Sequence, residues 1–304
     1  MKILNLFCRP GRTDLFALGQ KRLDRLRAEN RYSCYRNTRA TLHKLAAYRH
    51  GNKLPADQVT EAFVAGFRDF LIRQLGNSHN TVVENIKILS QLLDEAGVAP
   101  NPCHALQLSR EPTRRSYLHE DEVKRIMDLK IRTGSSLDIA RDIFFVECRT
   151  GLRISDLLQL QWGAYDGRFL RIRMQKTRRF VEVPVTRSVR SVLEKYRNLF
   201  SADDTYIFPI LPQDRRQGDF AQAKALIYAT GRVNLAIKRV AHLAGISKQV
   251  STHIGRHTFA TMLISKGASI YDIKELLGHQ DVKVTQVYAH LLDSRKEQLV
   301  EMLE

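Results

Sequence analysis

The sequence is poor in cysteine and contains no long apolar run. Its 304 residues include four cysteines, which are widely separated and form no Cys-x-x-Cys pair, so neither a disulfide framework nor a paired-thiol metal or redox site is indicated. No stretch approaches the ~18 apolar residues of a membrane span, and the apolar stretch from Ile3 to Cys8 is shorter than a signal-peptide core. We therefore expect reduced thiols, a cytoplasmic location and no membrane partner.

Acidic side chains are scarce relative to basic ones. The chain has 32 Asp and Glu against 49 Lys and Arg, a formal net charge of +17. Residues 1–110 carry 17 basic and 9 acidic side chains, so about half of the excess lies in this part. A basic excess spread over the whole chain favours a polyanionic partner that both halves touch, such as duplex DNA. A basic surface that serves only solubility is the alternative.

Residues 1 to about 105 show helical periodicity in four segments. The last three segments end near Gly51, Gly76 and Gly97, which are typical helix stops. The apolar stripes run from Leu15 to Leu26, Tyr35 to Ala46, Val59 to Leu71 and Val82 to Leu93. Four amphipathic helices joined by short loops predict a compact bundle.

The rest of the chain predicts more helices and one small antiparallel sheet. The residues from Phe169 to Val185 alternate with a period near two around a turn at residues 175–178, which indicates a β-hairpin. Helices are expected at the following segments: from Tyr117, 137–149, 154–160, 189–199, 224–244, 253–266, 270–277, 282–289 and 294–303. The polar stretch 213–219 is expected to be a loop. The fold class is therefore mainly α with a small antiparallel β-sheet.

Six side chains occur in an order that suits attack of a tyrosine on a phosphodiester. A phenol can become the covalent nucleophile, while guanidinium and imidazole groups neutralise and protonate the phosphoryl oxygens. A hydrolase would not need the phenol. The six residues are Arg153, Lys176, His253, Arg256, His279 and Tyr288.

The first two of these residues come from the middle of the chain. Arg153 follows Gly151 at a junction between two expected helices, where a guanidinium can hold two phosphate oxygens; Arg149 is the competing arginine. Lys176 lies in the turn of the expected hairpin, where it can donate a proton to a departing oxygen. Its neighbours at positions 177–179 are candidates for simple contacts with a nucleic acid backbone.

His253 and Arg256 are three residues apart and therefore share one face of a helix. His253 and His257 also have the spacing of two helical zinc ligands, which leaves a metal site as an alternative. No Glu follows His253 as in the His-Glu-x-x-His motif, and Arg256 would place positive charge beside the ion. We therefore expect His257 to be structural and the site to hold no metal.

The last two residues follow a predicted helix stop. His279 comes directly after Leu277-Gly278, so it can support negative charge that develops on a phosphate oxygen. Tyr288 follows nine residues later. A tyrosine with an ordinary pKa of about 10 is a poor nucleophile unless guanidinium and imidazole groups lie nearby. Of the chain's ten tyrosines, only Tyr288 has the required partners upstream, because Tyr271 precedes the helix stop.

At these positions the chain resembles the tyrosine recombinase (phage integrase) family, whose signature is Arg, Lys, His-x-x-Arg, His and Tyr in this order. The motifs cover about residues 117–304, and the helical region before them matches more loosely. The resemblance implies a SAM-like core-binding domain at residues 1–108, a linker at 109–116, and a catalytic domain at 117–304 that ends in a docking helix.

The resemblance also implies a mechanism and partners. Tyr288 would attack a scissile phosphate to give a 3′-phosphotyrosine, and Lys176 would protonate the leaving 5′-hydroxyl. The two arginines would stabilise the transition state, with the two histidines assisting. Strand exchange would then proceed through a Holliday junction. The implied partners are double-stranded DNA core sites and a homotetramer on paired sites, with no metal and no small-molecule cofactor, in a nucleoid-associated protein.

Several alternatives stay open from the sequence. Residues 294–303 are expected to dock on a neighbouring subunit or to fold back on their own domain. The helical bundle begins almost at once, which favours a Xer-like or inversion-type recombinase over one with an arm-binding domain of the lambda-integrase kind. A type IB topoisomerase uses the same chemistry as a monomer. A DNA-binding protein with a decayed active site and a zinc-dependent hydrolase are the remaining alternatives.

Overall fold

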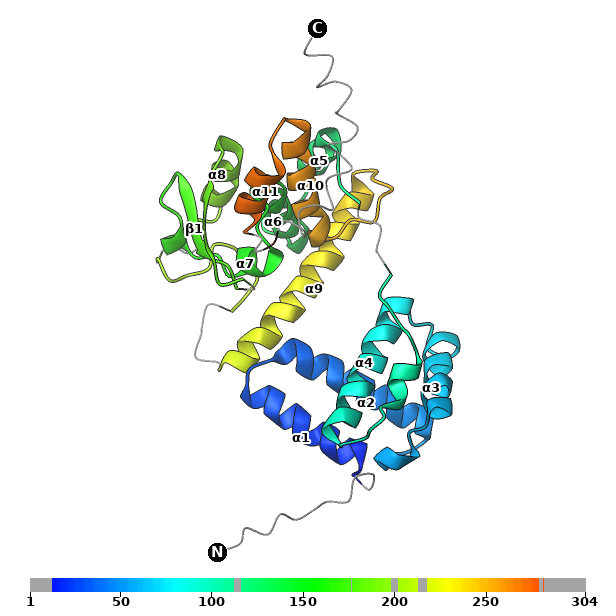
Figure 1. Cartoon of the computed structure of the whole chain (residues 1–304). Coiled ribbons are helices and arrows are strands. Elements are labelled where there is room, and N and C mark those ends of the chain that lie inside the picture. The colour runs from blue at the N-terminus through cyan, green and yellow to red at the C-terminus, as the bar shows by residue number, and fades with distance from the viewer. Residues whose placement is uncertain are drawn as a thin grey trace, which may run out of the picture. The chain divides into compact units, whose positions relative to one another are not determined.

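The computed structural model describes residues 13–111, 116–175, 177–197, 202–212, 218–278 and 281. The chain divides into two compact units (Figure 1). The first comprises Met1–Thr113 together with Gly218–Lys224, and the second comprises Arg114–Gln217 together with Ala225–Glu304. Among the described helices, none combines the length and the apolar character needed to cross a bilayer.

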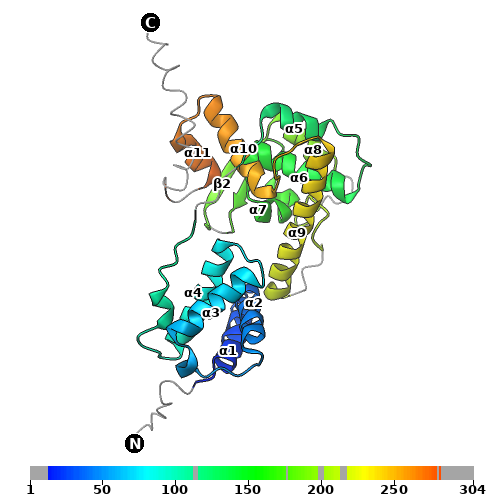
Figure 2. The ribbon, with the colours of Figure 1, turned by 90° about the vertical axis from the view of Figure 1, so that its right-hand side faces the viewer.

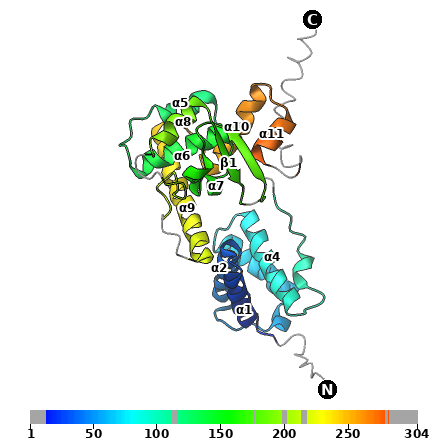
Figure 3. The ribbon, with the colours of Figure 1, turned by 90° about the vertical axis from the view of Figure 1, so that its left-hand side faces the viewer.

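The first unit is built from four helices, as the sequence predicts. They are α1 (Leu15–Ala28), α2 (Tyr32–Arg49), α3 (Glu61–Arg73) and α4 (His79–Glu95), with short 3-10 turns at Ala56–Gln58 and Pro102–Ala105. Figure 3 shows α1 and α2 side by side, and both pack against α4. Leu45, Phe67 and Leu89 are fully buried between these helices. The helix ends agree with the glycine stops to within a few residues, since α2 ends at Arg49 with His50 in the left-handed conformation.

The residues that follow the 3-10 turn at Pro102–Ala105 are tied to the start of α4. The His79 ring Nε2 lies 2.8 Å from the Ser109 carbonyl oxygen. The Asn80 side chain donates to the Glu111 carbonyl and accepts from the Glu111 backbone N–H, both at 3.0 Å. The chain up to Glu111 therefore belongs structurally to the first unit.

The second unit contains one small antiparallel sheet surrounded by helices. Its elements are α5 (Glu120–Met127), α6 (Ser136–Thr150), α7 (Ile154–Leu158), a 3-10 turn (Trp162–Ala164), β1 (Phe169–Arg173), β2 (Phe180–Pro184), α8 (Arg187–Glu194), α9 (Asp219–Leu243), α10 (Thr252–Ser265) and α11 (Ile270–Leu277). The residues of α9 up to Lys224 are the exception, because they belong to the first unit. Helix α6 is central, because it packs against α5, α7, α8 and α10. Figure 2 shows α10, α11 and β2 next to one another. The mainly α fold class with a small antiparallel sheet is confirmed.

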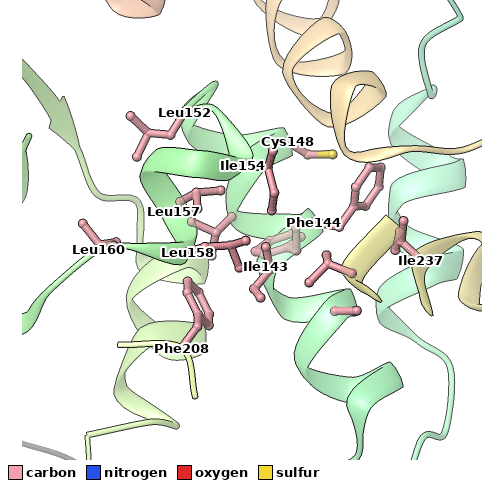
Figure 4. Packing of buried hydrophobic residues seen from close by; sticks show 14 of the residues in the cluster. Ile143, Phe144, Cys148, Leu152, Ile154, Leu157, Leu158, Leu160, Phe208 and Ile237 are labelled. Atoms are coloured by element: carbon pink, nitrogen blue, oxygen red, sulfur yellow. The ribbon is translucent and has the colours of Figure 1, made fainter. Parts of the chain in front are cut away.

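The core of the second unit gathers around α6 and α7. Phe144 and Phe208 are fully buried, and Figure 4 shows them beside side chains of α7 and α9, including Leu157 and Ile237. Eleven residues of α6 are buried, so this helix is covered on nearly all sides. Such a helix must carry any polar side chain inside the protein, and each of those side chains needs a partner.

The predicted hairpin is confirmed, with strands slightly shorter than expected. The register pairs Phe169 with Pro184 and Arg173 with Phe180. Met174 closes the turn through its backbone, which donates to the Arg179 carbonyl at 2.9 Å and accepts from the Arg178 N–H at 2.8 Å. Arg178 takes the left-handed conformation (φ 58°) that a glycine would normally occupy. The turn is thus defined by hydrogen bonds, although it contains no glycine.

Some predicted boundaries differ from the structure. Helix α9 begins at Asp219, five residues before the expected start, and Asp219 was expected in a loop. The early turns of α9 are rich in alanine, which has high helix propensity but adds little to an apolar stripe, and Asp219 is favoured at a helix start. Helix α8 runs over Arg187–Glu194, earlier than the expected 189–199, whose last residues lie outside the described part. The helices expected at 282–289 and 294–303 also lie outside it.

A buried ionic cluster joins α6 to the end of α8. Asp138 and Asp142 are each 1% exposed, and the Lys195 ammonium reaches both carboxylates at 2.6 and 2.7 Å. The Arg141 guanidinium donates to Asp138 at 2.6 Å, and the Tyr196 hydroxyl donates to Asp142 at 2.8 Å. Burial and the Asp142 carboxylate raise the pKa of Tyr196. Without Lys195, the two buried carboxylates would have to share the single guanidinium of Arg141, which contacts both, so one negative charge would stay unbalanced.

Lys195→Met is therefore expected to destabilise the second unit by about 3 to 5 kcal/mol. Lys266→Met is the matched control, because Lys266 pairs with Glu120 at 3.6 Å while 63% of its side chain is exposed. The control should cost less than about 1 kcal/mol. Urea unfolding of both variants measures the difference. Equal losses in the two variants would contradict a structural role for the buried cluster.

Candidate active site

The junction between α6 and α7 places Arg153. Gly151 caps α6 with φ 67°, and a Cβ at this position would lie 2.4 Å from the Phe259 ring, so only glycine fits. Leu152 is fully buried, and Arg153 follows as the N-cap of α7 in an extended conformation. This tight turn fixes the backbone from which the half-buried Arg153 side chain projects.

Arg256 lies in α10 and connects the ends of two other helices. Its side chain is almost fully buried, and Nη1 donates to the Gly151 carbonyl at 2.6 Å. Nη2 donates to the Leu277 carbonyl at 2.7 Å. Gly151 caps α6 and Leu277 is the last residue of α11, so both acceptors belong to helix C-termini, which carry partial negative charge. We call this pair of hydrogen bonds the Arg256 clamp.

Helix α7 presents three side chains to the hairpin turn. Arg153 Nη1 donates to Met174 Sδ at 3.2 Å, and Asp156 Oδ1 accepts from the Gln175 backbone N–H at 3.0 Å. The Gln175 side chain donates to Gln159 at 2.8 Å. Arg153 is the N-cap of α7, Asp156 lies within it and Gln159 is its C-cap, so all three side chains come from this one short helix and its caps. The backbone that leads into position 176 is therefore held against α7.

Burial shapes the electrostatics of this region. Burial lowers the pKa of Arg153, and the charge of Asp156 works in the opposite direction. Burial also raises the pKa of Asp156, although the Gln175 N–H and the charges of Arg153 and Arg256 lower it. Arginine stays charged in proteins despite such shifts. Two guanidinium groups thus lie around one buried carboxyl group, an arrangement that can bind the nonbridging oxygens of a phosphate.

Glu147 is a second buried carboxyl group near Arg256. Its side chain lies inside the contact between α6 and α10, where a Cβ at position 255 would come within 2.7 Å of its Oε2. Burial raises the pKa of Glu147 well above its ordinary value, while the charge of Arg256 and the Ile154 N–H lower it. Among the residues that the structure describes, Oε2 has no hydrogen-bond partner. Gly255 therefore makes room for a carboxyl group that the surroundings favour in its protonated form.

Glu147→Gln is expected to flatten the pH dependence of stability. The folded-state pKa lies above the ordinary value of 4.5, so the folded protein binds more protons than the unfolded chain between these two values. Wild-type stability should therefore fall as the pH rises from 4.5 through this window. The neutral variant lacks this loss, so its Tm relative to wild type should be higher at about pH 8 than at about pH 5.

Thermal unfolding followed by circular dichroism at both pH values measures this effect. Glu194→Gln is the control for the loss of one acidic side chain, because 41% of the Glu194 side chain is exposed. Its Tm difference from wild type should change little with pH. If the Glu147→Gln difference is also constant, burial does not govern the ionisation of Glu147.

The structure describes three of the six predicted site residues. Arg153 and Arg256 both contribute to the region around the C-cap of α6, since Arg256 binds the Gly151 carbonyl two residues before Arg153. His253 lies in the first turn of α10, exposed, one turn before Arg256. The other three, Lys176, His279 and Tyr288, lie outside the described residues.

The residues that directly precede Lys176 and His279 are described, and both have defined contacts or conformations. The Gln175 backbone N–H donates to Asp156, and Gly278 caps α11 in the left-handed conformation.

Within the described ranges, no group of three or more His, Cys, Asp or Glu side chains is arranged to hold a metal ion.

The sequence alone did not point to three residues of this site. They are Glu147, Asp156 and Met174. Glu147 was visible as a lone acidic residue in an apolar segment, and Asp156 follows Arg153 at helical spacing. Met174 gave no signal, because it reads as the last apolar residue of a strand.

Comparisons with family models and with related proteins point to the same family. Residues 116–295 match the model of the phage integrase family, and residues 14–98 match a phage integrase SAM-like domain. The tyrosine recombinase XerD of Brucella suis biovar 1 is 32% identical over 158 residues, which cover 50% of this chain and 48% of that protein. The chain thus spans about half the length of the first relatives it matches. XerD of Oceanobacillus iheyensis is 26% identical over 259 residues, 81% of this chain and 82% of that protein.

Solved structures share the fold. A lambda integrase dimer bound to a COC′ core site superposes with a TM-score of 0.66 at 20% identity, covering 91% of this chain and 95% of that one. A Tn1549 transposon integrase in complex with transposon right-end DNA gives a TM-score of 0.64 at 18% identity, covering 95% of this chain and all of that one. At these identities the likeness concerns the fold.

Proposed function

Because this chain belongs to the phage integrase family, we propose that it is a site-specific tyrosine recombinase that cleaves and rejoins DNA through a 3′-phosphotyrosine and a Holliday junction. One observation carries the proposal: Arg153, the N-cap of α7, and Arg256, on α10, are both held around the C-cap of α6, with Arg256 fixed by the Arg256 clamp. Preorganised cations of this kind stabilise charge that develops on a phosphate in the transition state.

The six side chains take the following roles. Tyr288 attacks the scissile phosphate, and its phenolic proton passes to His253 as the new P–O bond forms. Lys176 gives a proton to the 5′ oxygen as the old P–O bond breaks. Arg153 and Arg256 bind nonbridging oxygens, and the two histidines assist charge stabilisation and proton transfer. The covalent intermediate retains the energy of the broken bond, so rejoining needs no metal and no cofactor.

The same proposal assigns roles to the two units. The helical unit at residues 1–108 serves as the core-binding domain, and 117–304 is the catalytic domain. Residues 109–116 are the linker, whose first residues, up to Glu111, are hydrogen-bonded to the start of α4. The net charge of +17 supports a DNA partner for both parts. Structural neighbours include a lambda integrase tetramer bound to a Holliday junction. We propose a homotetramer on paired core sites in the nucleoid, with residues 294–303 docking on a neighbouring subunit.

Tyr288→Phe is expected to abolish formation of a covalent protein–DNA adduct, because phenylalanine has no oxygen to bond to phosphorus. The assay incubates protein with nicked duplexes that carry candidate core sites and resolves the products on denaturing gels. Tyr271→Phe is the matched control, since Tyr271 lies on α11 and is 70% exposed. The control should form the adduct at the wild-type level.

The outcomes separate the alternatives. An adduct with Tyr288→Phe would show that another residue is the nucleophile. A wild-type protein that binds these duplexes tightly and never forms an adduct would be a DNA-binding protein without catalytic activity. Relaxation of supercoiled DNA without any strand exchange between two sites would indicate topoisomerase activity.

Arg153→Lys is expected to lower the rate of adduct formation by roughly 100- to 1000-fold, because lysine cannot make a bidentate contact with phosphate. Arg149→Lys is the matched control four residues earlier. Arg149 pairs with Glu120 at 3.2 Å and lies over the Phe145 ring, so its loss should change the rate only a few-fold. Single-turnover kinetics on nicked duplex measures both variants. The reverse order of effects would assign the catalytic role to Arg149.

A further inference from the structure

Met174 occupies a buried position where three parts of the candidate site meet. It lies directly after β1, is fully buried, and has both backbone polar groups engaged in the hairpin turn. Its thioether sulfur accepts the hydrogen bond from Arg153 Nη1 at 3.2 Å. Its position therefore depends on the hairpin, while its sulfur contacts the N-cap of α7.

The same side chain also packs against the end of α11. A Cβ at position 278 would lie 2.6 Å from Met174 Sδ and 3.1 Å from both its Cε and Val181 Cγ2. Gly278 also has φ 61°, so glycine is required there on two grounds. The thioether thus rests on the backbone of the α11 cap. It links the turn around position 176, Arg153, and the residue that precedes position 279.

The two arginines are held by acceptors of different strength. Arg256 donates to two carbonyl oxygens, which are good acceptors. Within the described part of the chain, the Arg153 side chain donates to a thioether sulfur, which is a weak acceptor. A carbonyl or carboxylate in place of that sulfur would compete with a phosphate for the guanidinium. A weak acceptor orients the group and is displaced at little cost.

We propose that Met174 is a positioning residue that holds Arg153 in its phosphate-binding orientation until the scissile phosphate displaces the sulfur. This role rests on the proposed recombinase function and concerns the same site. It predicts that the sulfur affects the cleavage step, and that duplex binding, which depends on many phosphate contacts, does not need it.

Met174→Leu tests the role of the sulfur with little change in volume or burial. The rate of adduct formation on nicked duplex should fall on the order of 10-fold, while the Kd for the duplex stays within about 2-fold. Met127→Leu is the matched control, because Met127 is partly buried against the core of the same unit. It should leave both quantities unchanged. Thermal unfolding of both variants verifies that they fold.

A double-mutant cycle with Arg153→Lys identifies the route of the effect. If Met174 acts through Arg153, adding Met174→Leu to Arg153→Lys should cause no further loss of rate. Independent, multiplying losses would overturn the proposal, as would a Met174→Leu rate equal to that of wild type. A wild-type protein that forms no adduct would overturn the recombinase function itself, and this positioning role with it.

Discussion

The arrangement of the second unit depends on the Arg256 clamp. One guanidinium on α10 satisfies a carbonyl at the end of α6 and another at the end of α11, groups that the helices themselves leave without a partner. The nearly complete burial of Arg256 makes these bonds costly to lose, because an unpaired buried carbonyl pays its full desolvation penalty. The clamp therefore holds α6, α10 and α11 together and fixes the Arg256 guanidinium. Arg153 follows the C-cap of α6 by two residues, so the same helix end also fixes its backbone.

Close packing around the clamp depends on residues without side chains. Gly151 admits the Phe259 ring, and Gly278 admits the Met174 thioether, both in the left-handed conformation that ends a helix. Any larger residue at either position would separate the helix end from its neighbour. The two glycines thus let the backbone carbonyls approach Arg256 and let the hairpin approach α11. The short motifs around Gly151 and Gly278 are structural requirements as much as chemical ones.

These local signals explain how much the sequence could predict. The helices around Gly151 and Gly278, the hairpin, and the pairing of His253 with Arg256 on one face follow from periodicity and helix stops within a few residues. The early start of α9 was missed because alanine-rich turns show weak apolar periodicity. Met174 and Glu147 could not be assigned, because their roles come from contacts with other segments: Met174 with Arg153 and Gly278, and Glu147 with Gly255. Tertiary contacts of this kind leave no pattern in one sequence.

The positive potential that the two arginines offer to a phosphate depends on the groups that lie beside them. An ionised carboxylate beside Arg256 would pair with it and reduce the positive potential that a phosphate meets. Burial raises the pKa of Glu147 and of Asp156, which weakens this competition from inside the protein. Arg256 donates hydrogen bonds to carbonyl oxygens, which carry only partial charge, and Arg153 donates one to a thioether sulfur. The two carbonyl bonds of the Arg256 clamp and the sulfur bond of Arg153 therefore orient the guanidinium groups through acceptors that carry no full negative charge, so an incoming phosphate meets cations that these bonds have already placed.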